Sequence, residues 1–400
     1  MELRIKLSMN KSAYLLILML ISTCFFHFTP ISAFTRNDFC IVLFLLWLFA
    51  GHFMYNRPEN YSVLTLDKRL CWPLALVWGG VLISFFAANA LYGQGLFTSL
   101  VASRSMLSFL ALPALGLVSP GVKDIERAAV TFSVILLAFS ILDALGIPVI
   151  DREFFIDPEK PKELIDEGSF VMLLPGFQWV PISLFFFLDR LGRSLNLRDF
   201  LGAVFFIAGV FLLQNRTILI ASALPFAYVL FTIKGSSRRQ TVYLRFGAAV
   251  VALGLIAFTL PQWIKLFSET ATDLGNDDYN RILAYNYFFK EACPSPVYYL
   301  TGTGFISANV NPIMQDLMEV GIYNSDVGFV GFWNYYGILP IVCFIILIIK
   351  GFRASAPYFL KFNAFLILVG SATVACFDTM DKILWLCVYV LMLYKKEEYE

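Results

Sequence analysis

Apolar runs of about 20 residues recur along almost the whole chain, and each is long enough to cross the hydrocarbon core of a bilayer as a helix. The sequence is 59% hydrophobic and only 15% charged, whereas a soluble domain carries about 25% charge. Lipid offers no partners for open backbone groups, and no short alternating strands recur, so spanning segments must be helices. We therefore expect an all-α polytopic membrane protein that forms one integral membrane domain over residues 1–400.

The apolar pattern predicts about twelve spans, an even number that leaves both termini on one side. The predicted spans are residues 12–34, 38–54, 71–91, 103–118, 129–150, 169–188, 199–213, 217–233, 246–263, 327–349, 362–377 and 383–394.

The distribution of Lys and Arg predicts the orientation. The side of the membrane that holds the termini carries about twice as many Lys and Arg residues as the opposite side. This bias predicts cytoplasmic termini and an external loop over residues 264–326. The orientation depends on the number of spans that precede this loop. Met1–Lys11 is basic and Ala13–Phe26 is apolar, but no clear cleavage site follows, so we expect an uncleaved anchor.

Cysteine and histidine are placed unfavourably for metal or disulfide chemistry. Cys293 alone lies clearly in an outer loop, and no C-x-x-C pair is present. His27 and His52 lie in the first two predicted spans. We expect no metal ion and no cofactor.

A polar stretch from about Trp263 to Asp326 interrupts the apolar pattern, and roughly 60 residues are too many for a simple connector. Asn280–Glu291 has apolar residues at helical spacing, which predicts an amphipathic helix near the membrane surface. Thr301–Gly304 (TGTG) predicts a tight turn, and Asn311–Val320 a second short helix. No ATP is present outside the cell, so chemistry in this loop must use an already activated, lipid-borne substrate.

Two acidic segments of the outer loops have an ordinary interpretation as solvated loop. For the smaller outer loop, Asp151–Gly168, the alternative is a role in gating or substrate choice. The pair Asp277–Asp278 has divalent-ion binding as its alternative.

A charged side chain close to the hydrocarbon of the bilayer costs free energy, so each such residue is a candidate for a functional role. Five such residues lie on the predicted outer half: Arg104, Asp143, Arg216, Arg281 and Asp326.

The three arginines have two interpretations each. Arg216 stands at a polar turn between two apolar runs, either as a snorkelling interfacial residue or as an anion clamp that matches phosphate oxygens bidentately. Arg104 opens a span and Arg281 begins the loop helix, where an interfacial anchor or a solvated charge is the alternative. Three arginines that converge on one cavity would suit a diphosphate.

The two aspartates also remain open. Asp326, at the mouth of the tenth predicted span, is either a helix cap or a general base that takes a proton from a sugar hydroxyl. Asp143 either pairs with an arginine or lines a cavity.

Together these features resemble the Wzy-type O-antigen and capsular polysaccharide polymerases and the related O-antigen ligases. The matching segments are Gln214–Ile220 (QNRTILI), similar to an Arg-x-x-x-Leu pattern; Arg281 at the start of the large loop; Gly302–Phe305 (GTGF), similar to a Gly-x-Gly turn; and Asn324–Gly328 (NSDVG) followed by Tyr336–Gly337. The architecture covers the whole chain, whereas the motifs cover about 60 positions and are loose.

The resemblance implies a GT-C-like glycosyltransferase of the bacterial inner membrane. The enzyme would transfer a growing glycan from undecaprenyl diphosphate to a lipid-linked repeat unit at the periplasmic face, with inversion and without a metal. Arg216 and Arg281 would hold the diphosphate and Asp326 would take the acceptor proton. Arg104, Asn324, Asp143, Gly302 and Gly304 would bind substrate. A chain-length regulator and a flippase are implied partners, besides the glycan lipids and the bilayer, and no nucleic acid is expected.

Two other functions remain open. O-antigen ligases typically have a catalytic histidine near the end of the large loop, and Asn324-Ser325-Asp326 stands there instead, which favours a polymerase and leaves the identity of the base open. A flippase or transporter would usually show paired halves and midplane charges, neither of which is visible in this sequence.

Overall fold

The computed structural model describes residues 9–24, 33–55, 68–145, 147, 175–194, 196–213, 215–232, 242, 246–247, 249–250, 280–306, 313, 316–317, 320, 322–373 and 375–395. All regular structure in these residues is helical, which confirms the predicted all-α class. The acidic loop 151–168, Asp277–Asp278 and most of the helix predicted over Asn311–Val320 lie outside the described residues.

The labelled helices are α1 (Lys11–Ser22), α2 (Ala33–Tyr55), α3 (Lys68–Tyr92), α4 (Leu96–Ala102), α5 (Ala111–Val118), α6 (Val122–Ala144), α7 (Trp179–Arg193), α8 (Leu197–Leu212), α9 (Arg216–Thr232), α11 (Asn280–Asn286), α12 (Val297–Thr301), α14 (Gly328–Tyr336), α15 (Ile338–Gly351), α16 (Tyr358–Gly370) and α17 (Met380–Tyr394).

Three described helices are long and apolar enough to cross a membrane: Asn37–Tyr55, Leu70–Tyr92 and Val122–Leu142. A fourth span results if Leu96–Ala102 and Arg104–Val118, which meet at a bend of 69°, are counted together. The prediction of about twelve spans is therefore not confirmed, although the described helices fit an α-helical membrane protein.

Two predicted spans are interrupted by local geometry. The span expected over residues 12–34 is broken because α1 ends at Ser22, and Cys24 takes a positive φ of 51°. The span expected over residues 327–349 is divided into α14 and α15 at Gly337, whose φ is +73°. An added Cβ at Gly337 would lie 2.2 Å from the carbonyl oxygen of Leu300, so the large loop packs directly against this break.

Helix α2 shows why the chain suits lipid. Its exposed apolar side chains recur at helical spacing and form one face: Phe39, Val42, Leu46, Phe49 and Phe53. The opposite side buries Cys40, Ile41, Phe44 and Leu48 against the rest of the protein. A helix with an apolar outer face and an apolar inner face is typical of a membrane domain.

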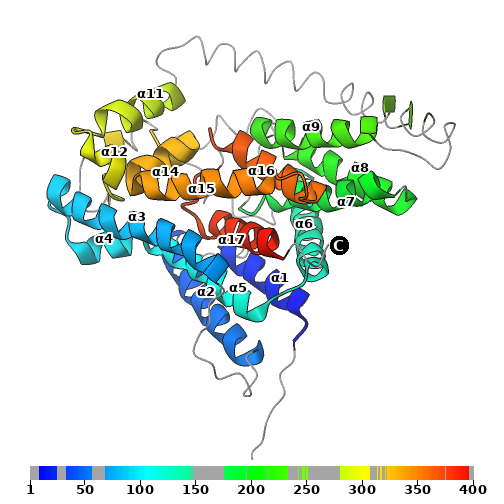
Figure 1. Cartoon of the computed structure of the whole chain (residues 1–400), viewed down its shortest axis with the longest axis horizontal. Coiled ribbons are helices and arrows are strands. Elements are labelled where there is room, and N and C mark those ends of the chain that lie inside the picture. The colour runs from blue at the N-terminus through cyan, green and yellow to red at the C-terminus, as the bar shows by residue number, and fades with distance from the viewer. Residues whose placement is uncertain are drawn as a thin grey trace, which may run out of the picture.

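Helix α17 forms the centre of the fold. In Figure 1 it runs through the middle of the molecule, and it contacts α1, α3, α5, α15 and α16. Nearly every residue from Met380 to Met392 is buried, as expected of a helix that is surrounded on all sides. Trp385 donates to Asn363 Oδ1 at 2.9 Å and Tyr389 to the Leu347 carbonyl at 3.0 Å, so its polar atoms fix its rotation.

One network of charged residues joins α6, α7 and α8, and we call it the bracing network (Glu126, Asp189, Arg190, Arg193 and Asp199). Arg190 pairs with Glu126 and with Asp199, the latter at 2.7 Å. Asp189 accepts from Arg193 at 3.0 Å and from the backbone N–H of Tyr358 at 2.8 Å. These contacts tie α16 to the same three helices.

Candidate functional site

The first part of the large loop forms the predicted amphipathic helix. Asn280–Asn286 is α-helical and Tyr287–Glu291 continues as a π-helical turn. Ala284 and Phe288, four residues apart, are buried toward the protein. Phe289, the next residue in the π turn, is exposed. Arg281 lies in the first turn and is exposed.

The glycine turn of the loop packs against the break between α14 and α15. The backbone N–H groups of Thr303 and Gly304 donate to the carbonyls of Asn334 and Tyr335 at 2.7 and 3.0 Å. Gly302 and Gly304 have φ values of +75° and +83°, and a Cβ on Gly302 would lie 2.4 Å from the Tyr335 oxygen. Close backbone packing accounts for both glycines, and their role in substrate binding stays a prediction.

The segment that precedes α14 holds Asn324 and Asp326. Asn324 is buried; its Nδ2 donates to the Gly331 carbonyl at 2.8 Å, and its Oδ1 lies 3.5 Å from Cys376 Sγ. Val327 is the N-cap residue of α14, and no side chain caps this helix. The helix-cap interpretation of Asp326 is therefore wrong, whereas the general-base interpretation remains a prediction.

Asp326 is half-buried among other charged groups, outside the described spans. Burial is the largest influence on its carboxyl and raises the pKa above the ordinary value; Arg281 and Lys382 oppose this rise, and Asp378 adds to it. The four residues therefore lie close enough to interact. We call them the charge cluster (Arg281, Asp326, Asp378 and Lys382).

Lys382 and Asp378 form the interior part of the charge cluster. Lys382 Nζ lies 3.5 Å from Asp378 Oδ1, and the two side chains are only 14% and 15% exposed. Lys382 stands in the first turn of α17. The charges thus run from exposed Arg281 to nearly buried Lys382.

The connection between α16 and α17 joins the elements that carry the candidate residues. The Ser371 carbonyl accepts from the backbone N–H of Phe329 at 2.7 Å, and the Ala372 carbonyl accepts from the Tyr285 hydroxyl. The hydroxyls of Thr373 and Thr217 are 3.0 Å apart. One short segment therefore contacts α14, α11 and α9.

Arg216 reaches this region through its helix. It is the first residue of α9, is half-buried and directly precedes Thr217. Helix α9 packs along α16, as Figure 1 shows. The start of α9 thus lies at the same connection as the charge cluster.

Arg104 and Asp143 have different surroundings. Arg104 pairs with Asp38 of α2, and its Nη1 donates to the Val101 carbonyl at 3.0 Å. This ion pair ties the 3-10 segment Arg104–Leu110 to α2, and both interpretations of Arg104 stay predictions. Asp143 lies in α6, and its side chain is outside the described residues.

Three polar residues at the start of α17 escaped the sequence analysis. Asp378 and Lys382 belong to the charge cluster, and buried Asp381 accepts from the backbone N–H of Gly176 and the amide of Gln178 at 2.9 and 3.1 Å. The available signal was three charged residues within five positions, directly before the last apolar run.

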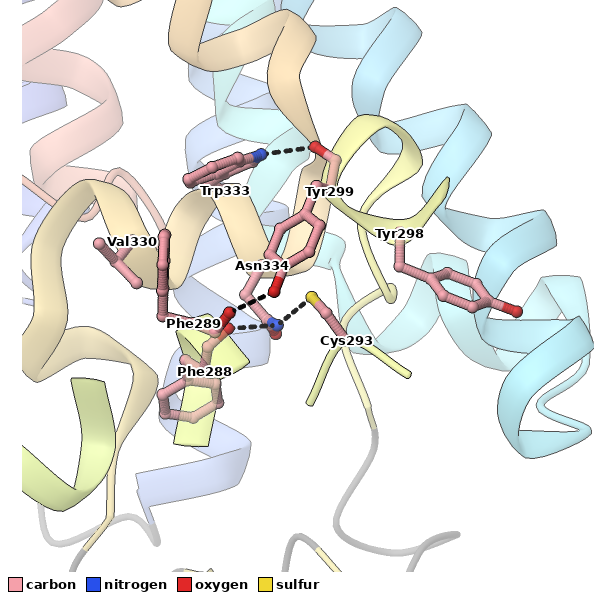
Figure 2. A pocket seen from close by; sticks show the side chains of 8 residues that line it. All are labelled: Phe288, Phe289, Cys293, Tyr298, Tyr299, Val330, Trp333 and Asn334. Atoms are coloured by element: carbon pink, nitrogen blue, oxygen red, sulfur yellow. Dashed lines mark hydrogen bonds between the residues drawn. The ribbon is translucent and has the colours of Figure 1, made fainter. Parts of the chain in front are cut away.

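A small depression lies between the π turn that follows α11, helix α12 and helix α14 (Figure 2). It is lined by Phe288, Phe289, Cys293, Tyr298, Tyr299, Val330, Trp333 and Asn334. Its empty volume of about 180 Å³ includes open solvent and leaves no enclosed space for a water molecule, whereas small ligand sites measure roughly 300 Å³. Asn334 donates to the Phe288 carbonyl and Trp333 to the Tyr299 carbonyl, so these groups serve the packing of the loop.

Among the described residues, no group of three or more His, Cys, Asp or Glu side chains is arranged to hold a metal ion. Searches against protein-family models and against curated proteins match nothing for this chain.

Proposed function

We propose that the chain is a polysaccharide polymerase that transfers a growing glycan from undecaprenyl diphosphate to a lipid-linked repeat unit at the outer face of the bacterial inner membrane. The observation that carries this proposal is the charge cluster. It combines a partly buried carboxylate with two cations at a connection that also touches the start of α9, where Arg216 stands. The resemblance of the loop motifs to Wzy-type polymerases supports the same conclusion.

The proposed reaction needs one base and several anion-binding groups. The acceptor hydroxyl loses its proton to Asp326 as its oxygen forms a bond to the anomeric carbon. The bond from that carbon to the phosphate oxygen breaks, and its electron pair leaves with the diphosphate. Arg281 and Arg216 stabilise the charge that develops on this leaving group. Displacement from the opposite face inverts the anomeric configuration.

The surroundings of Asp326 suit a base. A carboxylate with an ordinary pKa is weakly basic, and a pKa closer to the working pH improves proton transfer. Burial raises the pKa of Asp326 above its ordinary value and Asp378 adds to the rise, while Arg281 and Lys382 oppose it. The raised pKa makes the carboxylate of Asp326 a stronger base than an ordinary aspartate.

The proposal is tested first in cells by deleting the gene and separating the surface polysaccharide on a gel. A polymerase deletion leaves lipid A core with at most one repeat unit. Core alone, with long lipid-linked chains accumulating inside, would indicate a ligase. Core alone, with single lipid-linked repeats retained on the cytoplasmic side, would indicate a flippase.

The second test uses purified protein in nanodiscs with lipid-linked repeat units as both donor and acceptor. Polymer should form in the presence of EDTA and release undecaprenyl diphosphate. The variant Arg216→Ala should lose this activity, and polymer formation at the wild-type rate would remove Arg216 from the mechanism.

A further inference from the structure

Lys382 is a nearly buried cation beside two carboxylates, those of Asp378 and Asp381. Its side chain is 14% exposed, and burying an ammonium is unfavourable without a partner. It also occupies the first turn of α17, where the helix dipole disfavours positive charge. An apolar residue at this position would avoid both penalties.

The contact between Lys382 and Asp378 is loose. The N···O distance is 3.5 Å, whereas a close charge-assisted bond measures about 2.7–2.9 Å. An ammonium has three donors, so a contact of this length leaves capacity for a stronger acceptor. A phosphate oxygen is such an acceptor, and lysine binds phosphate as a compact point charge.

The neighbours of Lys382 define what could bind there. Arg281 supplies a second cation from the exposed loop helix, and Asp326 lies within the same cluster. Asp381 also acts electrostatically on Lys382, while its Oδ2 accepts hydrogen bonds from the backbone N–H of Gly176 and the amide of Gln178. An anion that reached Lys382 would contact the interior cation of the charge cluster, whose other cation, Arg281, is exposed.

We propose that Lys382 binds the diphosphate of the isoprenyl-linked substrate, and that Asp378 is its counter-ion while the site is empty. This inference rests on the proposed function for the identity of the ligand. Lys382 would then be an interior diphosphate-binding cation in addition to the arginines. Asp378 would compete with the diphosphate for the Lys382 ammonium and would be displaced when the substrate binds.

The test measures binding of farnesyl diphosphate to purified protein in detergent by isothermal titration calorimetry. Lys382→Met should weaken binding by about 10-fold or more, because it removes a charge-assisted contact. Lys290→Met is the control, since Lys290 is an exposed lysine of the large loop, and it should bind like the wild type. Farnesol, which lacks the diphosphate, should bind the wild type and Lys382→Met equally.

Asp378→Asn gives a second and opposite readout that a purely structural pair would not produce. Removal of the competing carboxylate should tighten farnesyl diphosphate binding several-fold, and this holds even if Lys382→Met does not fold. Unchanged or weaker binding by Asp378→Asn would overturn the inference. Wild-type affinity in folded Lys382→Met, or no binding by the wild type, would do so as well.

The outcomes separate this inference from the proposed function. If Lys382-dependent binding is found but the wild type forms no polymer, the diphosphate site stands and the polymerase proposal fails. If the wild type forms polymer and folded Lys382→Met binds farnesyl diphosphate like the wild type, the polymerase proposal stands and the role of Lys382 fails.

Discussion

The bracing network and the charge cluster use the same kinds of side chain in different ways. In the bracing network Arg190 holds two carboxylates, and Asp189 accepts from a side chain and a backbone N–H. In the charge cluster Lys382 and Asp378 pair at 3.5 Å, and Arg281 and Asp326 interact electrostatically. Tight pairing fixes helices against one another, whereas loose pairing leaves charges able to exchange partners.

The difference teaches where function can be sought among the charges of a membrane protein. A saturated network has little to offer a ligand, because binding would first break strong contacts. In a partly desolvated cluster with loose contacts, a ligand can replace one partner without first breaking a strong contact. The following predictions test whether this distinction holds.

The largest expected effect is on catalysis in the charge cluster. Asp326→Asn keeps the shape of the side chain but removes the base, so the rate of polymer formation should fall by about 10²–10⁴-fold. The measurement is the initial rate with purified lipid-linked repeats. Asp199→Asn, in the bracing network, serves as the control and should retain the activity per folded molecule. A rate for Asp326→Asn within threefold of the wild type would end the assignment of Asp326 as base.

The next effect is on stability in the bracing network. Arg190→Met removes the partner of Glu126 and Asp199, and we expect a loss of roughly 1–3 kcal/mol, discounted for solvent because the Arg190 side chain is 35% exposed. The measurement is thermal unfolding in detergent. Activity per folded molecule should be unchanged. A loss of activity without a loss of stability would erase the distinction between the two regions.

A smaller effect is expected on the pH dependence of stability. Burial raises the pKa of Asp326, so the folded protein binds a proton at this carboxyl more tightly than the unfolded protein does. This contribution to stability is lost as pH rises through the folded pKa. Asp326→Asn should therefore unfold at a higher temperature than the wild type at neutral pH. The difference should shrink toward pH 4. A variant that is less stable than the wild type at neutral pH would show that Asp326 is net stabilised by its cations.

The smallest effect is expected at Arg104, whose ion pair with Asp38 is partly exposed. Arg104→Lys should cost about 0.2–1 kcal/mol of stability and should leave the farnesyl diphosphate affinity unchanged. Arg281→Lys is the comparison, and it should weaken that affinity because it replaces a planar guanidinium. Equal losses of affinity in both variants would restore Arg104 to the diphosphate site.

The helical class could be predicted from composition, because a chain so apolar must satisfy its backbone within each segment. The number of spans could not, because hydropathy does not detect breaks such as Gly337, where a distant loop residue, Leu300, meets the backbone. The loop helix at Asn280 was predicted from apolar spacing, whereas its π turn depends on packing around Phe288.

In the sequence, the only sign that Arg281 and Asp326 are close together is that both belong to the large loop. The structure brings them within range of electrostatic interaction. Asp378 and Lys382 were missed because their importance depends on the fold: the connection between α16 and α17 lies against α9, α11 and α14, which are far away in sequence. Arg104 had the right residue type, but its partner Asp38 belongs to another helix.

The central position of α17 has a consequence for biogenesis. The helices that surround it, from α1 to α16, all leave the ribosome before it does. Until α17 enters the bilayer, those helices must keep open the space that it will fill, and the surfaces meant for Trp385 and Tyr389 face lipid or an insertase instead. A stalled or shortened nascent chain would therefore form a helix bundle that lacks its central helix, and quality-control proteases would meet it in that state.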